Sequence, residues 1–230
     1  MIIIRIICLL VGYAFGLIQT SYILGRANGI DIREHGSGNA GTTNTLRVLG
    51  KKAGLIVFVC DILKGFIAVN LVHFFLKDRY PDEMIYLLKL YTGLGVILGH
   101  NFPFYLKFKG GKGIAAMGGM ILGFHGIFAL TGFITFFGTF GISHYVSLAS
   151  LILSVEFFGE MLIFGILGLR EFALIPQNIL IEMYVVTFVI SSLAFIRHHE
   201  NIKKLIRGEE RKTYLKKKNK ESVEKTENEQ

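Results

Sequence analysis

The chain has 230 residues, of which 52% are hydrophobic, with a mean hydropathy of +0.52 and a formal net charge of +8. An ordinary soluble domain is about 45–50% apolar, and the excess here lies in long continuous runs. The composition therefore excludes a soluble globular protein and indicates an integral membrane protein. The two cysteines lie inside apolar runs, and the 7 histidines show no metal-binding spacing, so we expect no disulfide, no metal and no other cofactor.

Four apolar segments are each long enough to be a transmembrane helix. They are residues 2–24, 54–76, 84–100 and 178–196, and each supplies about the 17 to 25 residues that cross roughly 30 Å of hydrocarbon. Helices are expected because an unclosed strand would leave backbone groups unpaired in lipid. A cleaved signal peptide is the alternative for the first segment. Its apolar core is longer than usual, however, and no small-residue cleavage site follows it.

The positive charges predict the orientation. Lysines and arginines cluster in residues 26–52, 107–112 and 197–220, and cytoplasmic loops carry an excess of these residues. All three clusters are therefore expected in the cytoplasm, which places the N-terminus and the loop 76–83 outside.

The middle of the chain must then contain an even number of crossings. Residues 151–169 and 178–196 supply two, so residues 114–142 cross twice or not at all. Gly123, His125 and Gly126 break that segment near its centre. We predict an all-α integral membrane protein with a seven-helix polytopic bundle, five helices being the alternative, with the N-terminus outside and the C-terminus cytoplasmic.

The chain is predicted to contain one folded unit and a tail. Residues 1–207 form a single transmembrane catalytic domain, and residues 208–230 form a disordered, charged cytoplasmic tail. The basic part of the tail would be attracted to anionic lipid headgroups. It lacks a folded aromatic platform, so nucleic acid is not an expected partner.

A glycine-rich loop follows the first apolar segment. Residues 36–41 read GSGNAG and satisfy GxGxxG, but a bilayer-length helix precedes them where a dinucleotide fold needs a strand. The glycines still allow close backbone approach, residues 42–44 offer N-cap side chains for a short helix at 45–50, and a helix N-terminus favours an anion such as phosphate. Further candidate donors are Ser37, Asn39, Thr43, Asn44 and Arg47. A simple glycine-rich turn is the alternative.

Two more polar segments carry candidate chemistry. Residues 108–113 read FKGGKG; they lack the full Walker A pattern, yet a lysine among glycines is a second candidate anion site. The alternative there is a positive anchor beside a helix start. In the third segment, residues 197–204, His198 and Asn201 lie three apart on one helical face, with an amphipathic interface histidine as the alternative.

Together these segments carry a resemblance to a known family. The stretches SYILGR, GIDIREHGSGNAGTTNTLRVLGKKAG, DILKG, GHNFPFYLKFKGGKGIAAMGG and RHHENIKKLIRGEE are similar to the motifs of the bacterial acyl-phosphate-dependent glycerol-3-phosphate acyltransferases. The resemblance implies transfer of a fatty acyl group from acyl phosphate to the 1-position of glycerol 3-phosphate. The products would be lysophosphatidic acid and phosphate, in the first step of phospholipid synthesis. It also implies a multi-pass protein of the bacterial inner membrane with its active site on the cytoplasmic side.

The resemblance also implies roles for particular residues. It places His198, Asn201, Lys112 and Arg47 in catalysis. The positions implied to bind substrate or phosphate are Gly36, Ser37, Gly38, Asn39, Gly41, Thr43, Asn44, Lys109, Gly110, Gly111, Gly113 and Ser147. The family usually has alanine at the position of Thr42 and often arginine at that of His144, so the assignment of Ser147 is the weaker one.

Several alternatives stay open on the sequence alone. A membrane transporter of a phosphorylated metabolite is the competing class, although transporters commonly place their site at the midplane between repeated halves, and no repeat is visible. A lipid-binding scaffold is a third class. The proton of the attacking hydroxyl could pass to His198 or to a substrate phosphate. We expect the protein to be a monomer. Asp61 and Lys64 are predicted to form a structural ion pair, whereas the pattern gives no role to Glu156 and Glu160.

Overall fold

The computed structural model describes residues 1–214, which form nine α-helices and three short 3₁₀ segments without any strand. The α-helices are α1 (Ile2–Gly16), α2 (Thr20–Ala27), α3 (Thr42–Leu76), α4 (Asp82–Asn101), α5 (Ile114–Phe124), α6 (Gly126–Ser143), α7 (Val146–Leu167), α8 (Gln177–Arg197) and α9 (His199–Ile206). The 3₁₀ segments are η1 (Ile32–Glu34), η2 (Phe104–Leu106) and η3 (Arg170–Leu174). The predicted all-α membrane fold is confirmed.

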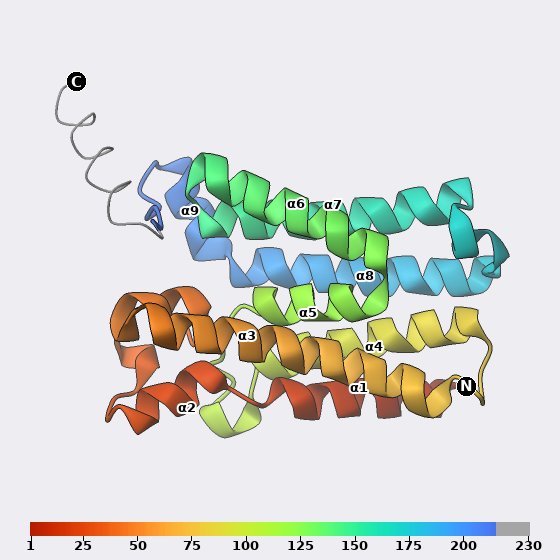
Figure 1. The fold of residues 1–230 in the computed structure, drawn as a ribbon, viewed down its shortest axis with the longest axis horizontal. Coiled ribbons are helices and arrows are strands. Elements are labelled where there is room, and N and C mark those ends of the chain that lie inside the picture. The colour runs from red at the N-terminus through yellow and green to blue at the C-terminus, as the bar shows by residue number, and fades with distance from the viewer. Residues whose placement is uncertain (215–230) are drawn as a thin grey trace.

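The long helices run side by side along one axis (Figure 1). The beginning of α3, the short helix α2 and α9 gather at one end of this bundle, on the left of the view. The N-terminus and the turn from α3 to α4 lie at the other end. We call these the loop end and the N-terminal end. All the polar segments singled out in the sequence therefore belong to the loop end.

Five segments are long and apolar enough to cross a membrane. They are Ile2–Ala27, Thr42–Leu76, Gly126–Ser143, Val146–Leu167 and Gln177–Arg197. Helix α5 has 11 residues, which at 1.5 Å per residue is about 16 Å and too short to cross the hydrocarbon alone. The prediction that residues 114–142 split near the middle is confirmed, because His125 has extended backbone between α5 and α6. The number of crossings stays a prediction.

The predicted span 2–24 lies within Ile2–Ala27, which is long and apolar enough to cross a membrane, but its helix is interrupted. Helix α1 ends at Gly16, and α2 begins at Thr20. Side chains satisfy carbonyl groups at this break: Gln19, which lies within it, donates to the carbonyl of Gly16 and also to those of Gly99 and His100 in α4. Tyr105 donates to that of Leu17. Because these hydrogen bonds replace the helical ones that are lost, the apolar segment can be interrupted here.

Helix α3 begins earlier than the predicted span at 54 and absorbs the predicted short helix. The two parts meet at Gly50, whose φ of 86° gives a left-handed kink that favours glycine. Residues 42–44 were expected to supply an N-cap side chain, and this was wrong. The N-cap is Gly41, which makes no side-chain cap bond, so the first turn keeps backbone N–H groups that no cap occupies.

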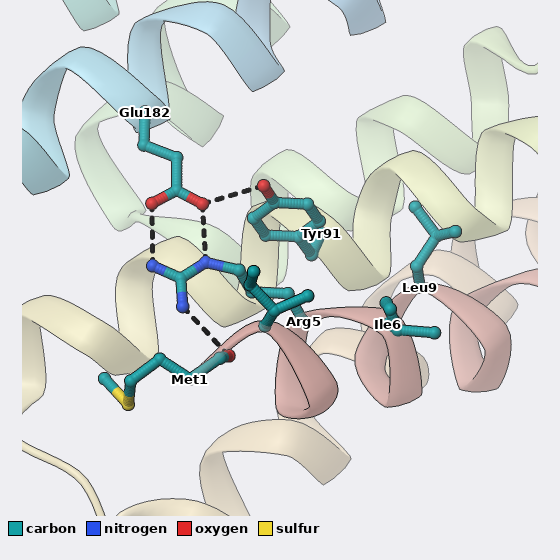
Figure 2. Close-up of a pocket in the computed structure, with 7 residues that line it drawn as sticks. Met1, Arg5, Ile6, Leu9, Tyr91 and Glu182 are labelled. Carbon is teal, nitrogen blue, oxygen red and sulfur yellow. Dashed lines mark hydrogen bonds and ion pairs between the residues drawn. The ribbon is translucent and has the colours of Figure 1, made fainter.

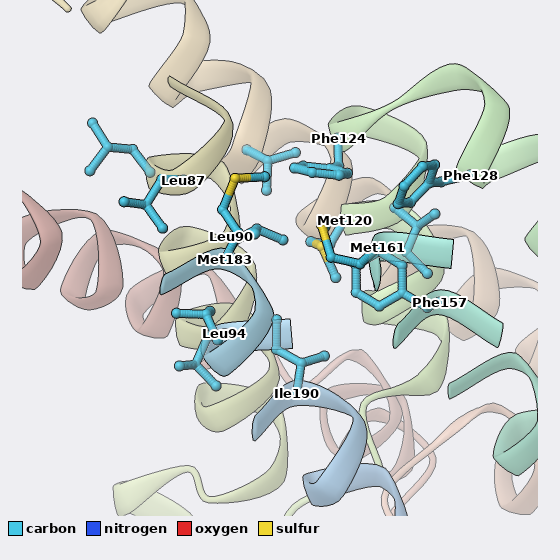
Figure 3. Packing of buried hydrophobic residues seen from close by; sticks show 14 of the residues in the cluster. Leu87, Leu90, Leu94, Met120, Phe124, Phe128, Phe157, Met161, Met183 and Ile190 are labelled. Carbon is cyan, nitrogen blue, oxygen red and sulfur yellow. The ribbon is translucent and has the colours of Figure 1, made fainter. Parts of the chain in front are cut away.

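The core of the bundle lies between α4, α5, α7 and α8. Leu87, Met120, Phe157 and Met183 come from these four helices and are fully buried against one another (Figure 3). Helices α1 and α4 approach so closely that a Cβ at Gly12 would lie 2.0 Å from the carbonyl oxygen of Thr92. Small residues at such crossings allow close van der Waals packing, which drives helix association in membranes.

The N-terminal end is held by an ion pair between helices. Arg5 of α1 donates to both carboxylate oxygens of Glu182 of α8, at 2.5 and 2.7 Å, and the hydroxyl of Tyr91 of α4 donates to the same carboxylate at 2.7 Å (Figure 2). The group borders a hollow of about 430 Å³. Because the charges neutralise one another, this cluster joins three helices and leaves no cation available for a ligand.

Candidate functional site

The first glycine loop is shaped by the buried amide of Asn44. Its Oδ1 accepts from the backbone N–H of Ser37 at 2.8 Å, and its Nδ2 donates to the carbonyls of Ile32 and His35 at 3.1 and 2.9 Å. Gly36 has a φ of 64° and lies so close that a Cβ there would be 2.2 Å from Asn44 Oδ1. The amide of Asn44 is therefore occupied within the loop.

The second glycine loop folds back onto the end of α4. The N–H groups of Gly110 and Gly111 donate to the carbonyls of Asn101 and His100, at 3.2 and 3.1 Å. A Cβ at Gly110 would lie 2.0 Å from the carbonyl oxygen of His100. Gly113 has a φ of 80° and is the N-cap of α5. Glycines are needed here for close backbone approach, and they bring Lys112 to the loop end.

The first two loops touch each other. A Cβ at Gly111 would lie 2.6 Å from the carbonyl oxygen of Ala40, so this glycine packs directly against the first loop. Arg33 adds a second connection: it pairs with Asp31 at 2.6 Å and donates to the carbonyl of Leu106 at 3.1 Å. The two predicted anion sites are therefore neighbours.

The third segment holds the second loop in place. Arg197 donates to the carbonyls of Gly110 and Gly111 at 3.2 and 3.0 Å. Lys112 Nζ donates to Asn201 Oδ1, and Asn201 Nδ2 donates to Glu210 Oε1 at 2.8 Å. All three predicted motifs thus converge at one place. Both cations at this junction are held by neutral oxygen atoms.

Burial changes the protonation behaviour of Lys112. Its pKa falls from 10.5 to about 8, chiefly because burial disfavours the ammonium form. The negative charge of Glu210 opposes this fall, while Arg197 and Lys204 add to it. Lys112 is still mostly cationic at neutral pH, and its charge is poorly solvated. An anion bound beside it would supply the missing stabilisation.

His198 is buried and neutral. Its Nδ1 lies 2.7 Å from the carbonyl oxygen of Ala194, which can only accept, so Nδ1 carries the proton and Nε2 is left as an acceptor. Burial first, and then the charges of Lys112 and Arg197, lower the pKa of His198 to about 4. The ring can therefore accept a hydrogen bond from a hydroxyl, but it gains a proton reluctantly.

The remaining predicted site residues differ in how much of each side chain is exposed. Ser37, Arg47 and Lys109 are exposed and Thr43 is half-buried. Asn39 packs on Gly41, where a Cβ would lie 2.8 Å from Asn39 Nδ2. Ser147 is in the first turn of α7, buried, and its hydroxyl has no partner among residues 1–214. The structure brings Lys112 and Asn201 into direct contact, whereas Arg47 makes no hydrogen bond or ion pair with another predicted site residue in the described part of the chain.

The comparisons with known proteins agree with this geometry. Residues 6–208 match the family described as glycerol-3-phosphate acyltransferase. The chain belongs to this family. It is 37% identical over 209 residues to the glycerol-3-phosphate acyltransferase of Staphylococcus haemolyticus strain JCSC1435, and 38% identical over 209 residues to that of Staphylococcus aureus strain JH9. Each alignment covers 90% of this chain and 96% of the relative.

Solved structures of one integral membrane relative also match. The glycerol 3-phosphate form of the acyltransferase PlsY has a TM-score of 0.77 at 33% identity and covers 91% of this chain and 96% of that one. Its lysophosphatidic acid form has a TM-score of 0.73 at 33% identity and covers 91% of this chain and 95% of that one. The chain is thus an acyltransferase, and the transporter alternative is not supported.

Some site residues were not anticipated from the sequence. Arg197 was quoted in the third motif without a role, and Glu210 was assigned to the tail. Residues 208–214 of the predicted tail contact this end of the bundle, where the N–H of Thr213 donates to the carbonyl of His144 at 2.9 Å, and the rest of that predicted disordered tail, 215–230, lies outside the described residues. The ion pair of Asp61 and Lys64 is confirmed at 2.7 Å. Glu160 accepts from Thr131 at 2.8 Å, and the structure suggests no further role for it.

Proposed function

We propose that this enzyme transfers a fatty acyl group from acyl phosphate to the 1-hydroxyl of glycerol 3-phosphate at the loop end of the bundle. The observation that supports this most is the ammonium of Lys112, which extends from the second glycine loop and contacts a neutral amide oxygen instead of a carboxylate. Both substrates carry phosphate, and the two neighbouring loops offer donors to two anions.

The predicted residues divide into phosphate binding and alignment of the hydroxyl. Lys112 and Arg47 supply charge, while Ser37, Thr43 and the glycine backbone at the start of α3 supply donors. A helix N-terminus favours an anion because its N–H groups and its dipole point outward. Ser147 and Lys109 complete the list of proposed contacts. Asn44 shapes the loop, since its amide is fully used there.

The reaction needs no protein nucleophile. The hydroxyl oxygen of glycerol 3-phosphate attacks the acyl carbonyl carbon, the bond from that carbon to the phosphate oxygen breaks, and inorganic phosphate leaves. Lys112 and the loop N–H groups stabilise the charge that develops on the phosphate. His198 Nε2 accepts the hydrogen bond of the attacking hydroxyl. Its pKa of about 4 makes a phosphate oxygen the better final acceptor of the proton.

The donor distinguishes this proposal from other acyltransferase chemistry. Purified protein should form lysophosphatidic acid from acyl phosphate and glycerol 3-phosphate, and it should show negligible activity with acyl-CoA or acyl carrier protein as donor. Excess inorganic phosphate should inhibit, and EDTA should have no effect. Equal rates with acyl-CoA would contradict the donor assignment, and a requirement for a divalent metal would contradict the proposal that protein cations alone bind the phosphates.

We further propose that the loop end faces the cytoplasm of a bacterial inner membrane. The positive-inside rule supports this, because the cationic segments lie at that end. In a variant without Cys8 and Cys60, Asn39→Cys and Lys109→Cys should be shielded from a membrane-impermeant thiol reagent in intact cells. Asp82→Cys at the N-terminal end should react. Labelling of Asn39→Cys from outside would reverse the orientation.

A further inference from the structure

Lys64 is a buried lysine that joins α3 to two other parts of the bundle. It pairs with Asp61 at 2.7 Å, donates to the carbonyl of Ile18 at 2.9 Å in the break after α1, and lies 2.7 Å from His100 Nδ1 in α4. Its side chain is 3% exposed. An ammonium has three N–H groups and no acceptor, and this one lies against an ion-pair partner, a carbonyl oxygen and a ring nitrogen.

This arrangement fixes the tautomer of His100. Because Lys64 can only donate, Nδ1 of His100 must accept, and the proton of the neutral ring then sits on Nε2. Asp61 neutralises the charge of Lys64, so the cluster as a whole requires no charge on the ring. His100 therefore presents one N–H donor whose direction is set by α3 and α4.

That donor faces the junction of the two glycine loops. A Cβ at Gly111 would lie 2.1 Å from His100 Nε2 and 2.6 Å from the carbonyl oxygen of Ala40. Any residue other than glycine at position 111 would thus fill the space in front of Nε2. His100 is 3% exposed, and within residues 1–214 nothing accepts a hydrogen bond from Nε2. Nε2 is not one of the atoms that are fully buried without a partner, so it keeps access from the loop junction, where a ligand oxygen can replace water as its acceptor.

We propose that His100 contacts substrate through its Nε2–H, which donates to an anionic oxygen of a substrate phosphate bound where the two loops meet. Lys64 and Asp61 are the positioning residues that hold the ring. This inference rests on the proposed function, and it adds an uncharged hydrogen-bond donor, the His100 ring, to the cationic phosphate site. The oxygen belongs either to glycerol 3-phosphate or to the acyl donor.

Two substitutions separate contact with substrate from a purely structural role. His100→Gln places an amide nitrogen near the position of Nε2, whereas His100→Asn places its amide near Nδ1 and keeps an acceptor for Lys64. We expect kcat/KM of His100→Gln to stay within about threefold of the unmodified protein. We expect His100→Asn to raise the KM for one substrate at least about tenfold, with a smaller change in kcat, as loss of a hydrogen bond to a charged group implies.

The identity of the phosphate follows from which KM changes. Glycerol 3-phosphate is varied at saturating acyl phosphate, and acyl phosphate is varied at saturating glycerol 3-phosphate. A rise in the first KM alone assigns the contact to the acceptor substrate, and a rise in the second alone assigns it to the donor. Unchanged KM values for both substrates in a folded His100→Asn protein would overturn the inference, as would lower activity in His100→Gln than in His100→Asn.

A binding measurement covers the case in which His100→Asn does not fold. The thermal stabilisation of purified protein by inorganic phosphate is then compared between His100→Gln and the unmodified protein. Equal stabilisation is expected, and its loss in folded His100→Gln would overturn the inference. If the unmodified protein is inactive with acyl phosphate, the proposed function fails. If it is active and His100→Asn is unaffected, only the role of His100 fails.

Discussion

Arg5 and Lys112 are partly buried cations at opposite ends of the bundle, and their partners differ. Arg5 donates to both oxygens of the carboxylate of Glu182, so its charge is neutralised where it stands. Lys112 donates to the neutral amide oxygen of Asn201, and the nearest carboxylate, that of Glu210, contacts the far side of the same amide. A cation neutralised by a carboxylate holds helices together, whereas one held by neutral atoms remains available to bind an anion.

The largest effect is expected when the charge of Lys112 is removed. Lys112→Met should lower kcat/KM by roughly 10- to 150-fold, because a hydrogen bond to a charged group contributes about 1.5–3 kcal/mol. Arg5→Met is the matched control: it should lower the thermal stability by leaving Glu182 unpaired, while the KM values of folded protein stay unchanged. Steady-state kinetics of both variants would refute the comparison if Arg5→Met weakened substrate binding as much as Lys112→Met.

A smaller loss is expected from a methyl group at the junction of the loops. Gly111→Ala would place a Cβ 2.1 Å from His100 Nε2 and 2.6 Å from the carbonyl oxygen of Ala40, so the second loop must shift. We expect a loss of about tenfold in kcat/KM, mostly through KM, because displaced donors no longer fit the phosphate. Gly118→Ala is the control, since a Cβ there meets nothing within 4 Å. Equal kinetics for the two variants would show that the loop tolerates the shift.

The smallest expected effect is a change in pH dependence. Lys112 has a pKa of about 8, and the charge of Glu210 raises it. As the pH rises through this pKa, Lys112 loses its proton, so kcat/KM should fall on the alkaline side. Glu210→Gln keeps an acceptor for Asn201 but removes the charge, which lowers the pKa of Lys112. The alkaline limb should therefore move to lower pH. Glu209→Gln, at an exposed neighbour, should leave the limb in place. If the alkaline limb of Glu210→Gln did not move, the charge of Glu210 would not be what raises the pKa of Lys112.

The parts of the fold that depend on local pattern could be predicted from the sequence. The segment 178–196 is predominantly apolar and corresponds to α8 (Gln177–Arg197), and the glycines and histidine near 125 marked the break between α5 and α6. The interruption after Gly16 could not be predicted in this way, since residues 17–18 are apolar. Part of what stabilises it comes from distant residues, because Lys64 and Tyr105 donate to the carbonyls of Ile18 and Leu17.

The functional site shows the same contrast between residues that local patterns predict and partners that only tertiary contacts supply. Glycines around a lysine, and a histidine three residues before an asparagine, are local patterns, and they pointed to Lys112, His198 and Asn201. The partners of these residues depend on tertiary contacts. Arg197 holds the second loop from 86 residues away, and Glu210 reaches Asn201 only because Gly208, with a φ of 70°, turns the chain back after α9. Sequence pattern alone therefore assigned Glu210 to the tail.

The central claim is that the cations of the loop end, and not those of the N-terminal end, bind phosphate. The most direct test is equilibrium binding of glycerol 3-phosphate to purified protein without an acyl donor, measured by calorimetry for the unmodified protein, Lys112→Met and Arg5→Met. We predict that Arg5→Met binds as the unmodified protein does and that Lys112→Met, although folded, binds at least about tenfold more weakly. Unchanged affinity in Lys112→Met would contradict the account.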